Sequence, residues 1–444
     1  MQILSSFRWM RRFALQLAVV SFALVLVVPL AACGGSSSSG STTTTTGPVT
    51  LTYWSWIPGM DKQVALFNQS HPNIHIVLSN VGAGPVEYTK LFTAIKANNE
   101  PDLSQIEFQI LPQYETTGSL VDISPYGANS VKNVFPAWMW SQVTLGNAVY
   151  AIPQDGGPMA MFYRADIFTK YNLPVPTTWA QYADDAAKLH AADPKEYITD
   201  FPPRNPGWFV GLLWQNGANL FSISGQSWKV TINSPQALQV ASYWQDLISK
   251  KLIKTDPDFS NSWYSDLQTG AVATWMSGAW GNGIIKQNAP QSAGKWRVAP
   301  LPQWQAGQNV SSNWGGSTTV VFKSTKHPQE ASVFAQWISA NEQSAELEFS
   351  TGAYPALLSA LSSSTVNSPQ PFFGNQVINE VFSESAKQVN VNFQWGPSME
   401  QVYNDMGDNF ANAVNGHGTL SDGLNAVQQS TITYMQKQGF SVTS

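Results

Sequence analysis

Tryptophan is the residue whose type and placement most suggest ligand chemistry in this chain. The 444 residues include 18 Trp, and several lie at the ends of strand-like segments or in turns rich in Gly and Pro. An indole ring offers a large apolar face and one N–H donor, while nearby amides and carboxylates supply directed hydrogen bonds. These residue types predict non-covalent binding of a small ligand in a cleft. The candidates in such places are Trp54, Trp56, Asp155, Trp208, Asn313, Trp314 and Gly316.

Patterns of known catalytic and metal-binding sites are missing from the sequence. It has no G-x-S-x-G elbow, no P-loop and no G-x-G-x-x-G motif that opens a helix. His71 and His75 have the separation of metal ligands, but Pro72 and the strand beginning at Ile74 break any shared helix face. Acids from distant segments could still converge as an acid–base pair. The residues therefore predict binding without catalysis, metal or cofactor, and a hydrolase remains an alternative.

Strand patterns and helix patterns alternate from Val49 onward. We expect strands at 49–53, 74–78, 103–108, 159–163 and 320–322, and helices at 61–68, at 88–95, after Thr178, after Ser234 and at 331–338. This alternation predicts an α/β fold with parallel sheets covered by helices. Ligands of such sheets bind just beyond the carboxyl ends of the strands, where Trp54 and Trp56 follow the first strand.

Length, composition and charge exclude some classes of protein. The chain is long enough for two domains of ordinary size. Its formal net charge is −5, so it lacks the basic face with which a protein binds nucleic acid. Aromatic residues make up 12% of the chain and charged residues only 11%, so there is ample apolar surface to form a core.

The N-terminus predicts export and a lipid anchor. Basic residues from Arg8 precede an apolar run at 13–30, which ends in Leu-Ala-Ala-Cys at Cys33. This order is typical of a secretory signal peptide, and the tetrad resembles the bacterial lipobox. The resemblance implies that residues 1–32 are removed and that Cys33 carries lipid. An uncleaved transmembrane anchor and twin-arginine export are the alternatives. Residues 33–47 then form a tether rich in Gly, Ser and Thr.

Several segments in a fixed order resemble one protein family. The segments are 51–56, 101–103, 118–123, 150–153, 161–164, 173–179, 269–280, 315–322, 327–331 and 352–355. Their order and spacing resemble extracellular solute-binding protein family 1, the sugar-binding lipoproteins of ABC importers, which includes maltose-binding protein. The match spans nearly all of the chain after the tether.

The resemblance implies a two-lobed periplasmic-binding-protein fold, similar to type II, in which each lobe is a mainly parallel sheet flanked by helices. Lobe one would comprise 48–156 plus 304–356, and lobe two 157–303 plus 357–444, with the ligand in the cleft between them. A sugar would close the lobes by a hinge, and the closed monomer would dock on a membrane permease driven by a cytoplasmic ATPase. The lipid anchor would keep the protein near that permease.

The resemblance also implies roles for particular residues. Trp280 matches the family motif whose aromatic residue stacks on sugar, and Gln109 follows a strand where the family places a polar or aromatic contact. Trp395 matches a late aromatic residue of the maltose branch. Asp155, at the first crossing between lobes, would accept hydrogen bonds from sugar hydroxyls or cap the next segment.

One departure from the family bears on the ligand. Trp56-Ile57-Pro58-Gly59 replaces the charged residues of the maltose branch, which disfavours maltose and favours a ligand held by stacking. The alternatives are the same scaffold binding an amine, peptide or phosphate compound, and a surface glycoside hydrolase. A binder of cations would need acids clustered near the tryptophans, and the sequence alone reveals no such cluster.

Overall fold

The computed structural model describes residues 47–443. Residues 47–444 form one compact unit with a hydrophobic core of its own. The expected signal peptide at 1–32, Cys33 and nearly all of the tether at 33–47 lie outside the described residues. Among the described helices, none is both long enough and apolar enough to cross a lipid bilayer.

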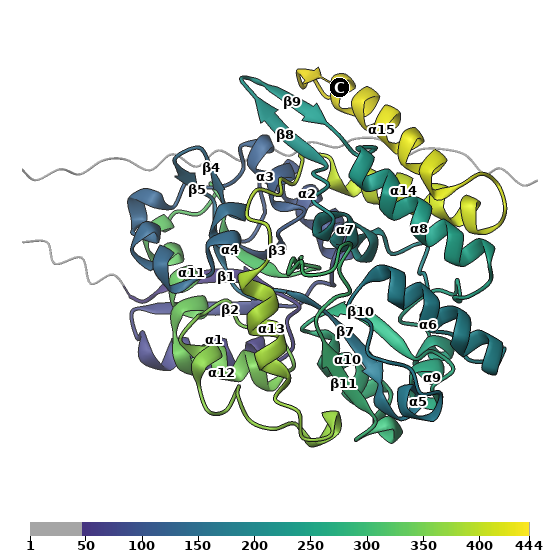
Figure 1. The fold of residues 1–444 in the computed structure, drawn as a ribbon. Coiled ribbons are helices and arrows are strands. Elements are labelled where there is room, and N and C mark those ends of the chain that lie inside the picture. The colour runs from purple at the N-terminus through teal and green to yellow at the C-terminus, as the bar shows by residue number, and fades with distance from the viewer. Residues whose placement is uncertain (1–46, 444) are drawn as a thin grey trace, which may run out of the picture. The chain divides into compact units, whose positions relative to one another are not determined.

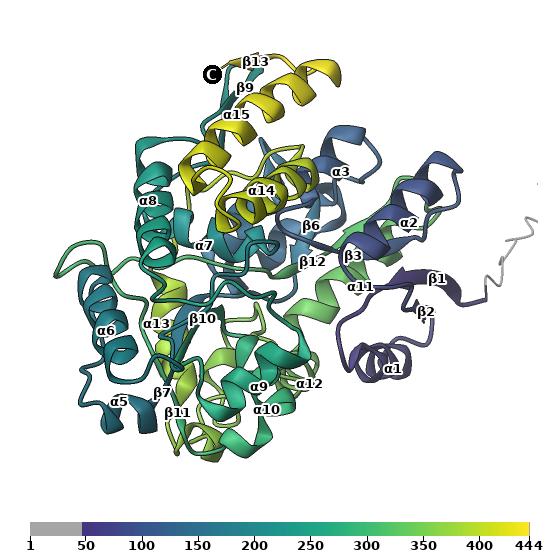
Figure 2. The ribbon, with the colours of Figure 1, turned by 90° about the vertical axis from the view of Figure 1, so that its right-hand side faces the viewer.

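The first sheet has five strands in the order β2-β1-β3-β12-β6 (Figure 1 labels β1, β2 and β3, and Figure 2 labels all five). They are β1 (Val49–Trp54), β2 (Ile74–Ser79), β3 (Leu103–Glu107), β6 (Ala151–Pro153) and β12 (Ser317–Val321). β1 pairs in parallel with β2 and β3, whereas β12 pairs antiparallel with β3 and β6. The sheet is therefore mixed. All five residues of β12 are buried, as expected for a strand covered on both faces.

Helices on both sides explain that burial. They are α1 (Met60–Ser70), α2 (Pro85–Lys96), α11 (Pro328–Ala340) and α12 (Glu342–Ser350). Phe334 of α11 packs edge-on against Tyr53 of β1 and Phe67 of α1, with ring centroids 5.1 and 5.0 Å apart. α2 lies on the other side of β1 from α1 (Figure 2). The strand and helix patterns predicted for this part of the chain are confirmed.

The second sheet has three strands in the order β10-β7-β11. They are β7 (Met159–Arg164), β10 (Thr274–Gly278) and β11 (Trp296–Ala299), and both pairings are antiparallel. The two-lobed α/β fold is confirmed below, but the expectation of a mainly parallel sheet in each lobe is wrong: this sheet is antiparallel, and only two of the four pairings in the first sheet are parallel. Strands buried on both faces read as continuous apolar runs whatever their direction, so burial in β7 and β10 concealed the antiparallel pairing.

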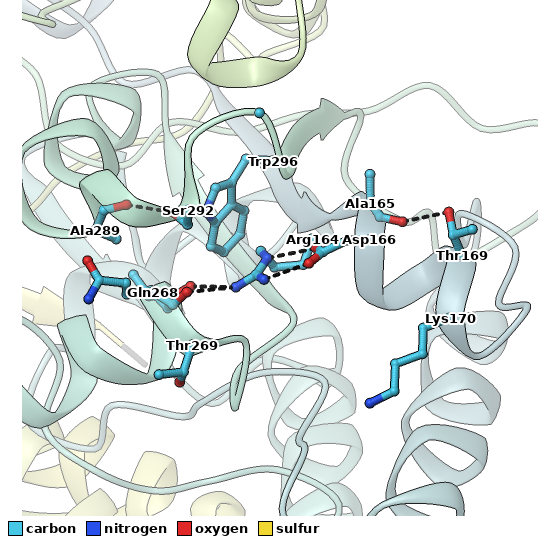
Figure 3. Close-up of polar contacts among 12 residues, drawn as sticks. Arg164, Ala165, Asp166, Thr169, Lys170, Gln268, Thr269, Ala289, Ser292 and Trp296 are labelled. Carbon is cyan, nitrogen blue, oxygen red and sulfur yellow. Dashed lines mark hydrogen bonds and ion pairs between the residues drawn. The ribbon is translucent and has the colours of Figure 1, made fainter.

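A buried arginine ties the second sheet to the helix after β7. Arg164 is 2% exposed, and its guanidinium donates to both carboxylate oxygens of Asp166, at 2.9 and 2.7 Å (Figure 3). It also donates to the backbone carbonyls of Leu267 and Gln268 and lies 5.8 Å from the ring centre of Trp296. Buried cations need such partners, so Arg164 holds α5 (Ala165–Lys170) and α9 (Asn261–Thr269) on the sheet.

Further helices cover this sheet or form a helical group beside it. They are α6 (Trp179–Ala192), α7 (Pro206–Gln215), α8 (Pro235–Ser249), α10 (Gly281–Asn288), α13 (Ile378–Lys387), α14 (Met399–Val414) and α15 (Leu420–Lys437). Two predicted helix starts are confirmed: the Thr178 hydroxyl accepts from the N–H of Gln181, and the Ser234 hydroxyl from that of Ala237. Such caps satisfy N–H groups that lack partners within the helix.

The remaining elements are small. They are α3 (Leu111–Thr117), α4 (Ala137–Gln142), the hairpin of β4 (Thr144–Leu145) and β5 (Ala148–Val149), and the sheet of β8 (Phe221–Ser224), β9 (Ser227–Val230) and β13 (Val442–Thr443). β13, near the C-terminus, pairs in parallel with β9 beside α15 (Figure 2).

The chain passes between the two main sheets at three places: after β6, between β11 and β12, and after α12. These crossings bond to one another. The N–H of Gly156 donates to the carbonyl of Tyr354 at 2.9 Å, and the N–H of Trp314 donates to that of Gly157 at 2.9 Å. The exact lobe boundaries expected from the sequence remain predictions.

Candidate ligand-binding site

A cavity of about 480 Å³ lies where the ends of both main sheets meet. An adjoining cavity of about 230 Å³ shares part of its wall. We call the two together the cleft. The first is lined by Trp56, Ile57, Pro58, Gln105, Glu107, Asp155, Asn205, Phe259, Trp280, Gly283, Ile284, Gln287, Trp314, Gly315, Gly316, Ser317, Thr351, Gly352 and Ala353, and the second adds Pro85, Tyr88, Gln109, Ile110, Gly207, Glu400, Tyr403 and Asn404.

Trp280 and Trp314 form the aromatic centre of the cleft. The Nε1–H of Trp280 donates to the carbonyl of Trp314 at 2.8 Å, and the two rings meet edge-on with centroids 4.6 Å apart. Trp275 packs edge-on behind both, at 5.8 and 6.3 Å. Because the only indole donor of Trp280 is already bonded, its ring face is the part left for a ligand. Such a face suits stacking rather than hydrogen bonding.

Two glycines allow this close packing of indole and backbone. A Cβ atom at Gly157 would overlap the carbonyl oxygen of Trp314, and one at Gly278 would lie 2.5 Å from Nε1 of Trp280. Glycine is the residue that permits another group to approach the backbone so closely. The indole pair is therefore placed by the first crossing and by the last residue of β10.

The loop after β1 is fixed by Gln105 of β3. Its Oε1 accepts from the hydroxyl of Ser55 at 2.7 Å and from the N–H of Trp56 at 3.1 Å. Its Nε2 donates to Ser317 at 2.8 Å. Trp56 also packs edge-on against Tyr88, with centroids 5.9 Å apart. This network connects three strands and holds the Trp56 ring at the cleft wall.

Two carboxylates of the cleft lie in a poorly solvated environment. Asp155 accepts from the N–H of Ser317 at 2.6 Å, so it caps β12 while bordering the cavity, and burial raises its pKa to about 7. Glu107 accepts from the hydroxyl of Tyr88 at 2.7 Å, and burial raises its pKa as well. Removal from water disfavours the charged form of an acid. Both groups therefore lack the strong cationic partner that would keep them ionised.

The structure brings together six of the ten predicted ligand contacts. Trp56, Gln109, Asp155, Trp280, Trp314 and Gly316 line the cleft. Asn313 is 2% exposed and instead positions the crossing. Its Oδ1 accepts from the N–H of Gly157 at 2.8 Å, and its Nδ2 donates to the carbonyl of Gly315 at 2.7 Å. Trp54 is half-buried on β1 and is not among the lining residues.

Two other predicted tryptophans belong to the core. Trp208 lies on α7 rather than in a loop, so the loop placement is wrong. It is 1% exposed, it donates to the carbonyl of Met276 at 3.0 Å, and its ring lies 4.9 Å from that of Trp244. Trp395 is 5% exposed and packs edge-on against Phe393 and Trp214. Neither lines the cleft.

Sequence reasoning missed several residues of the cleft. Glu107 lies two positions before Gln109, and strand alternation could have paired them. Phe259 lies in a polar loop and has a backbone φ of +55°, a signal that only the structure reveals. Tyr403 and Glu400 come from α14, far along the chain, and nothing in their local sequence marks them. Asn205 also lines the cleft and was not predicted.

A larger cavity of about 850 Å³ lies elsewhere, lined by parts of α4, of the 354–367 segment and of α13. We place the ligand site in the cleft rather than there. Ligands of open α/β sheets bind beyond the carboxyl ends of the strands. β1, β3 and β10 end at or beside the cleft, and the antiparallel strand β12 begins there.

The family profile described as bacterial extracellular solute-binding protein matches residues 53–345, more than half of the chain. This chain belongs to that family. Among curated relatives, the lactose-binding protein of Rhizobium radiobacter is 24% identical over 76% of this chain and 82% of its own length. The arabinooligosaccharide-binding protein of Bacillus subtilis is 24% identical over 67% of this chain and 71% of its own.

Solved structures agree with this assignment. A binding protein of B. animalis subsp. lactis in complex with β-1,6-galactobiose is 30% identical, with a TM-score of 0.79 over 90% of this chain and all of that one. The galacto-N-biose/lacto-N-biose I-binding protein of Bifidobacterium longum, in complex with lacto-N-biose, is 26% identical, with a TM-score of 0.82 over the same shares. The two-lobed α/β fold and the function as an extracytoplasmic solute-binding protein are thus confirmed.

Proposed function

We propose that this solute-binding protein captures a mono- or oligosaccharide and delivers it to an ABC permease, without catalysis of its own. The observation that carries the proposal is the indole pair of Trp280 and Trp314 in the cleft, whose ring faces suit the C–H surfaces of a sugar. The relatives bind lactose, arabinooligosaccharides and galactobiose, which supports a saccharide as the ligand.

The cleft also has the polar groups that such a ligand requires. Gln287, Asn205 and Asp155 lie around the aromatic centre, and each can bond to sugar hydroxyls. A few directed polar groups among aromatic faces are typical of small-molecule sites. Closure of the lobes about the crossings would bring the two walls of the cleft together. A ligand that contacts both walls stabilises this closed state relative to the open one.

We also propose that Cys33 carries the lipid that anchors the protein outside the cytoplasmic membrane. The Leu-Ala-Ala-Cys tetrad and the absence of any other cysteine in the sequence support this assignment. Fractionation of cells that express a Cys33→Ser chain tests it, because the variant should leave the membrane fraction if the cysteine holds the anchor.

The function is tested by thermal denaturation of residues 48–444 against mono- and oligosaccharides, amino acids and polyamines. A ligand that binds only the native state raises the melting temperature with its occupancy. We expect a saturable rise with one class of saccharide, and no shortened product. Trp280→Ala should abolish the rise, whereas Trp228→Ala, a half-buried tryptophan on β9 outside the cleft, should retain it.

Other outcomes would contradict the proposal. A rise with amino acids or polyamines but with no saccharide would identify a different solute. Steady release of shorter sugars would indicate a hydrolase, and loss of that turnover on removal of two carboxylates would prove it.

A further inference from the structure

The cleft carries acids from three distant parts of the chain. Glu107 and Asp155 line its main cavity, and Glu400 joins Glu107 at the adjoining cavity. Among the residues that line these two cavities there is no Lys, Arg or His. Lys286 borders a neighbouring cavity, where its ammonium group donates to Oδ1 of Asn282 and Oε1 of Gln370. The lining of the cleft therefore has acidic side chains and no basic ones, so any charge that it carries is negative.

The surroundings of these acids do not neutralise that charge. Glu107 accepts from the hydroxyl of Tyr88 and lies near Tyr403, and Asp155 accepts from the N–H of Ser317. Behind Asp155 stands a further acid, Glu348 of α12, which is 1% exposed and whose Oε1 has no hydrogen-bond partner. Carboxylates shielded from water normally have a cationic partner. Here burial raises the pKa of Asp155 and of Glu348, and the neighbouring carboxylates, Glu107 and Asp155 respectively, raise them further.

Aromatic faces surround the same space, independently of the acids. Trp56, Phe259, Trp280 and Trp314 all line the main cavity, and the Phe259 ring lies 6.3 and 6.4 Å from those of Trp280 and Trp314. An ammonium group is attracted to aromatic faces, most strongly to tryptophan. Carboxylates beside tryptophan faces thus form an environment that suits a positive charge and repels a negative one.

We propose that the ligand is a saccharide with a free amino group, bound between the carboxylates of Glu107, Asp155 and Glu400 and the indole faces of Trp56, Trp280 and Trp314. This inference rests on the proposed function and names its class of substrate. Anionic sugars are excluded from the cleft by the same charges. The cluster of acids near tryptophans, which the sequence did not reveal, forms because positions 107, 155 and 400 meet only in the fold.

The test is isothermal titration calorimetry of residues 48–444 with matched sugars. Four forms of the same mono- and disaccharides, in the gluco and galacto series, are compared: the neutral hexose, the 2-amino sugar, its N-acetyl derivative and the uronic acid. We expect the amino sugar to bind about tenfold or more tightly than the N-acetyl form, since one charge-assisted hydrogen bond supplies that ratio. The uronic acid should not bind.

The outcomes separate this inference from the proposed function. Equal or tighter binding of the neutral or N-acetyl sugar would overturn the amino-sugar assignment and leave sugar binding intact. If no form of any saccharide binds, the proposed function fails. Binding of the uronic acid as tightly as the amino sugar would likewise contradict the inference.

Variants that remove charge but keep shape test the role of the acids. Asp155→Asn and Glu400→Gln should each reduce the preference for the amino sugar over the neutral sugar about tenfold. Asp408→Asn, at an exposed residue paired with Arg204, is the control and should change nothing. A preference unchanged in both cleft variants would overturn the proposal.

A calorimetric measurement on the unmodified protein tests the same contact without relying on variants, which could fail to fold. An ammonium group beside Asp155 would lower the pKa of that carboxyl from about 7, so the amino sugar should release protons when it binds near pH 6.5. Titration in two buffers with different heats of ionisation measures this release. Absence of proton release would contradict the contact with Asp155.

Discussion

Phe259 is held in the left-handed backbone region, at φ +55°, and the residue is 39% exposed, with its ring beside the indole pair. Bulky residues rarely adopt that conformation because Cβ approaches the following carbonyl. Its neighbours fix the loop: Nδ2 of Asn205 donates to Asp258 at 2.6 Å, and the hydroxyl of Ser260 caps α9. Strain that persists next to a binding site suggests that the ring is placed there for the ligand.

Two variants at this residue separate strain from ligand contact. Phe259→Gly and Phe259→Ala both remove the ring, but only glycine adopts the left-handed region freely. We expect the glycine variant to be about 1 kcal/mol more stable than the alanine variant in urea unfolding. Both should weaken saccharide binding to the same extent. Equal stability of the two would show that the backbone is not strained, and unchanged affinity would exclude a ligand contact.

At this scale the sequence predicted part of the site. Trp280 was predicted from the family motif that it matches, and Trp314 because it directly precedes a pair of glycines, Gly315 and Gly316. Trp208 and Trp395 have the same residue type and similar local sequence, yet their rings are in the core. Residue type and alternation cannot tell a ring that faces a cavity from one that faces another ring. That distinction depends on contacts between distant segments.

Among the secondary-structure elements, the start of β12 most directly shapes the cleft. Gly316 precedes this strand with φ +94°, and a Cβ atom there would lie 2.9 Å from the carbonyl oxygen of Asp155 and from the ring of Phe108. The carbonyl belongs to the first crossing, so β12 and that crossing approach each other more closely than any side chain permits.

Gly316→Ala should therefore destabilise the protein by about 2–4 kcal/mol, as the sum of left-handed strain and a clash with backbone. Gly294→Ala is the matched control, because its φ is +81° but no atom lies within 4 Å of the added Cβ. The Gly294→Ala variant should lose only about 1 kcal/mol of its free energy of unfolding, because it has the left-handed strain without the clash. Urea unfolding compares the two free energies of unfolding, and equal losses would show that the close approach can relax.

Helix positions were largely predictable, and sheet direction was not. Thr178 and Ser234 marked helix starts because a side-chain oxygen must satisfy exposed N–H groups there. No local sequence feature indicates the direction of β10 and β11 relative to β7. It is set by long connections, and strands covered on both faces carry the same apolar residues in either direction.

For the whole molecule, buried acids dominate the dependence of stability on pH. Burial raises the pKa of Glu87, Glu115 and Asp155 to about 7 and that of Asp258 to about 6. An acid with a raised native pKa binds more protons in the folded state than in the unfolded state, so stability falls as pH rises from the unfolded pKa to the native one. The window runs from about pH 4 to pH 7.

Without ligand, the protein should melt at a higher temperature at pH 5.5 than at pH 8. Each kcal/mol of difference corresponds to about 2–4 °C for a domain of 150–250 residues, and to somewhat less here. Differential scanning calorimetry measures the shift. Asp122 and Asp166 have lowered pKa values, so they are ionised in both the folded and the unfolded state over this range and do not affect the difference. A melting temperature that rises with pH over this range would contradict the expectation.

The overall architecture was predicted from the resemblance rather than from periodicity. Alternation of strands and helices indicated α/β structure, but only the order of short segments along the chain implied two lobes and a cleft. Neither the resemblance nor the periodicity predicted the acidic character of the cleft. Each acid lies in an ordinary local sequence, and their proximity depends on three crossings that the chain makes between its sheets.

The indole pair also makes the protein an optical sensor of its own ligand. Tryptophan emission responds to the polarity around the ring, and the two coupled rings, 4.6 Å apart, contribute strongly to near-ultraviolet circular dichroism. Trp179, Trp208, Trp214, Trp244, Trp263 and Trp296 are fully buried and supply a constant background. A change in fluorescence on mixing would then report capture of the solute in real time, without a dye, and allow its rate constants to be measured.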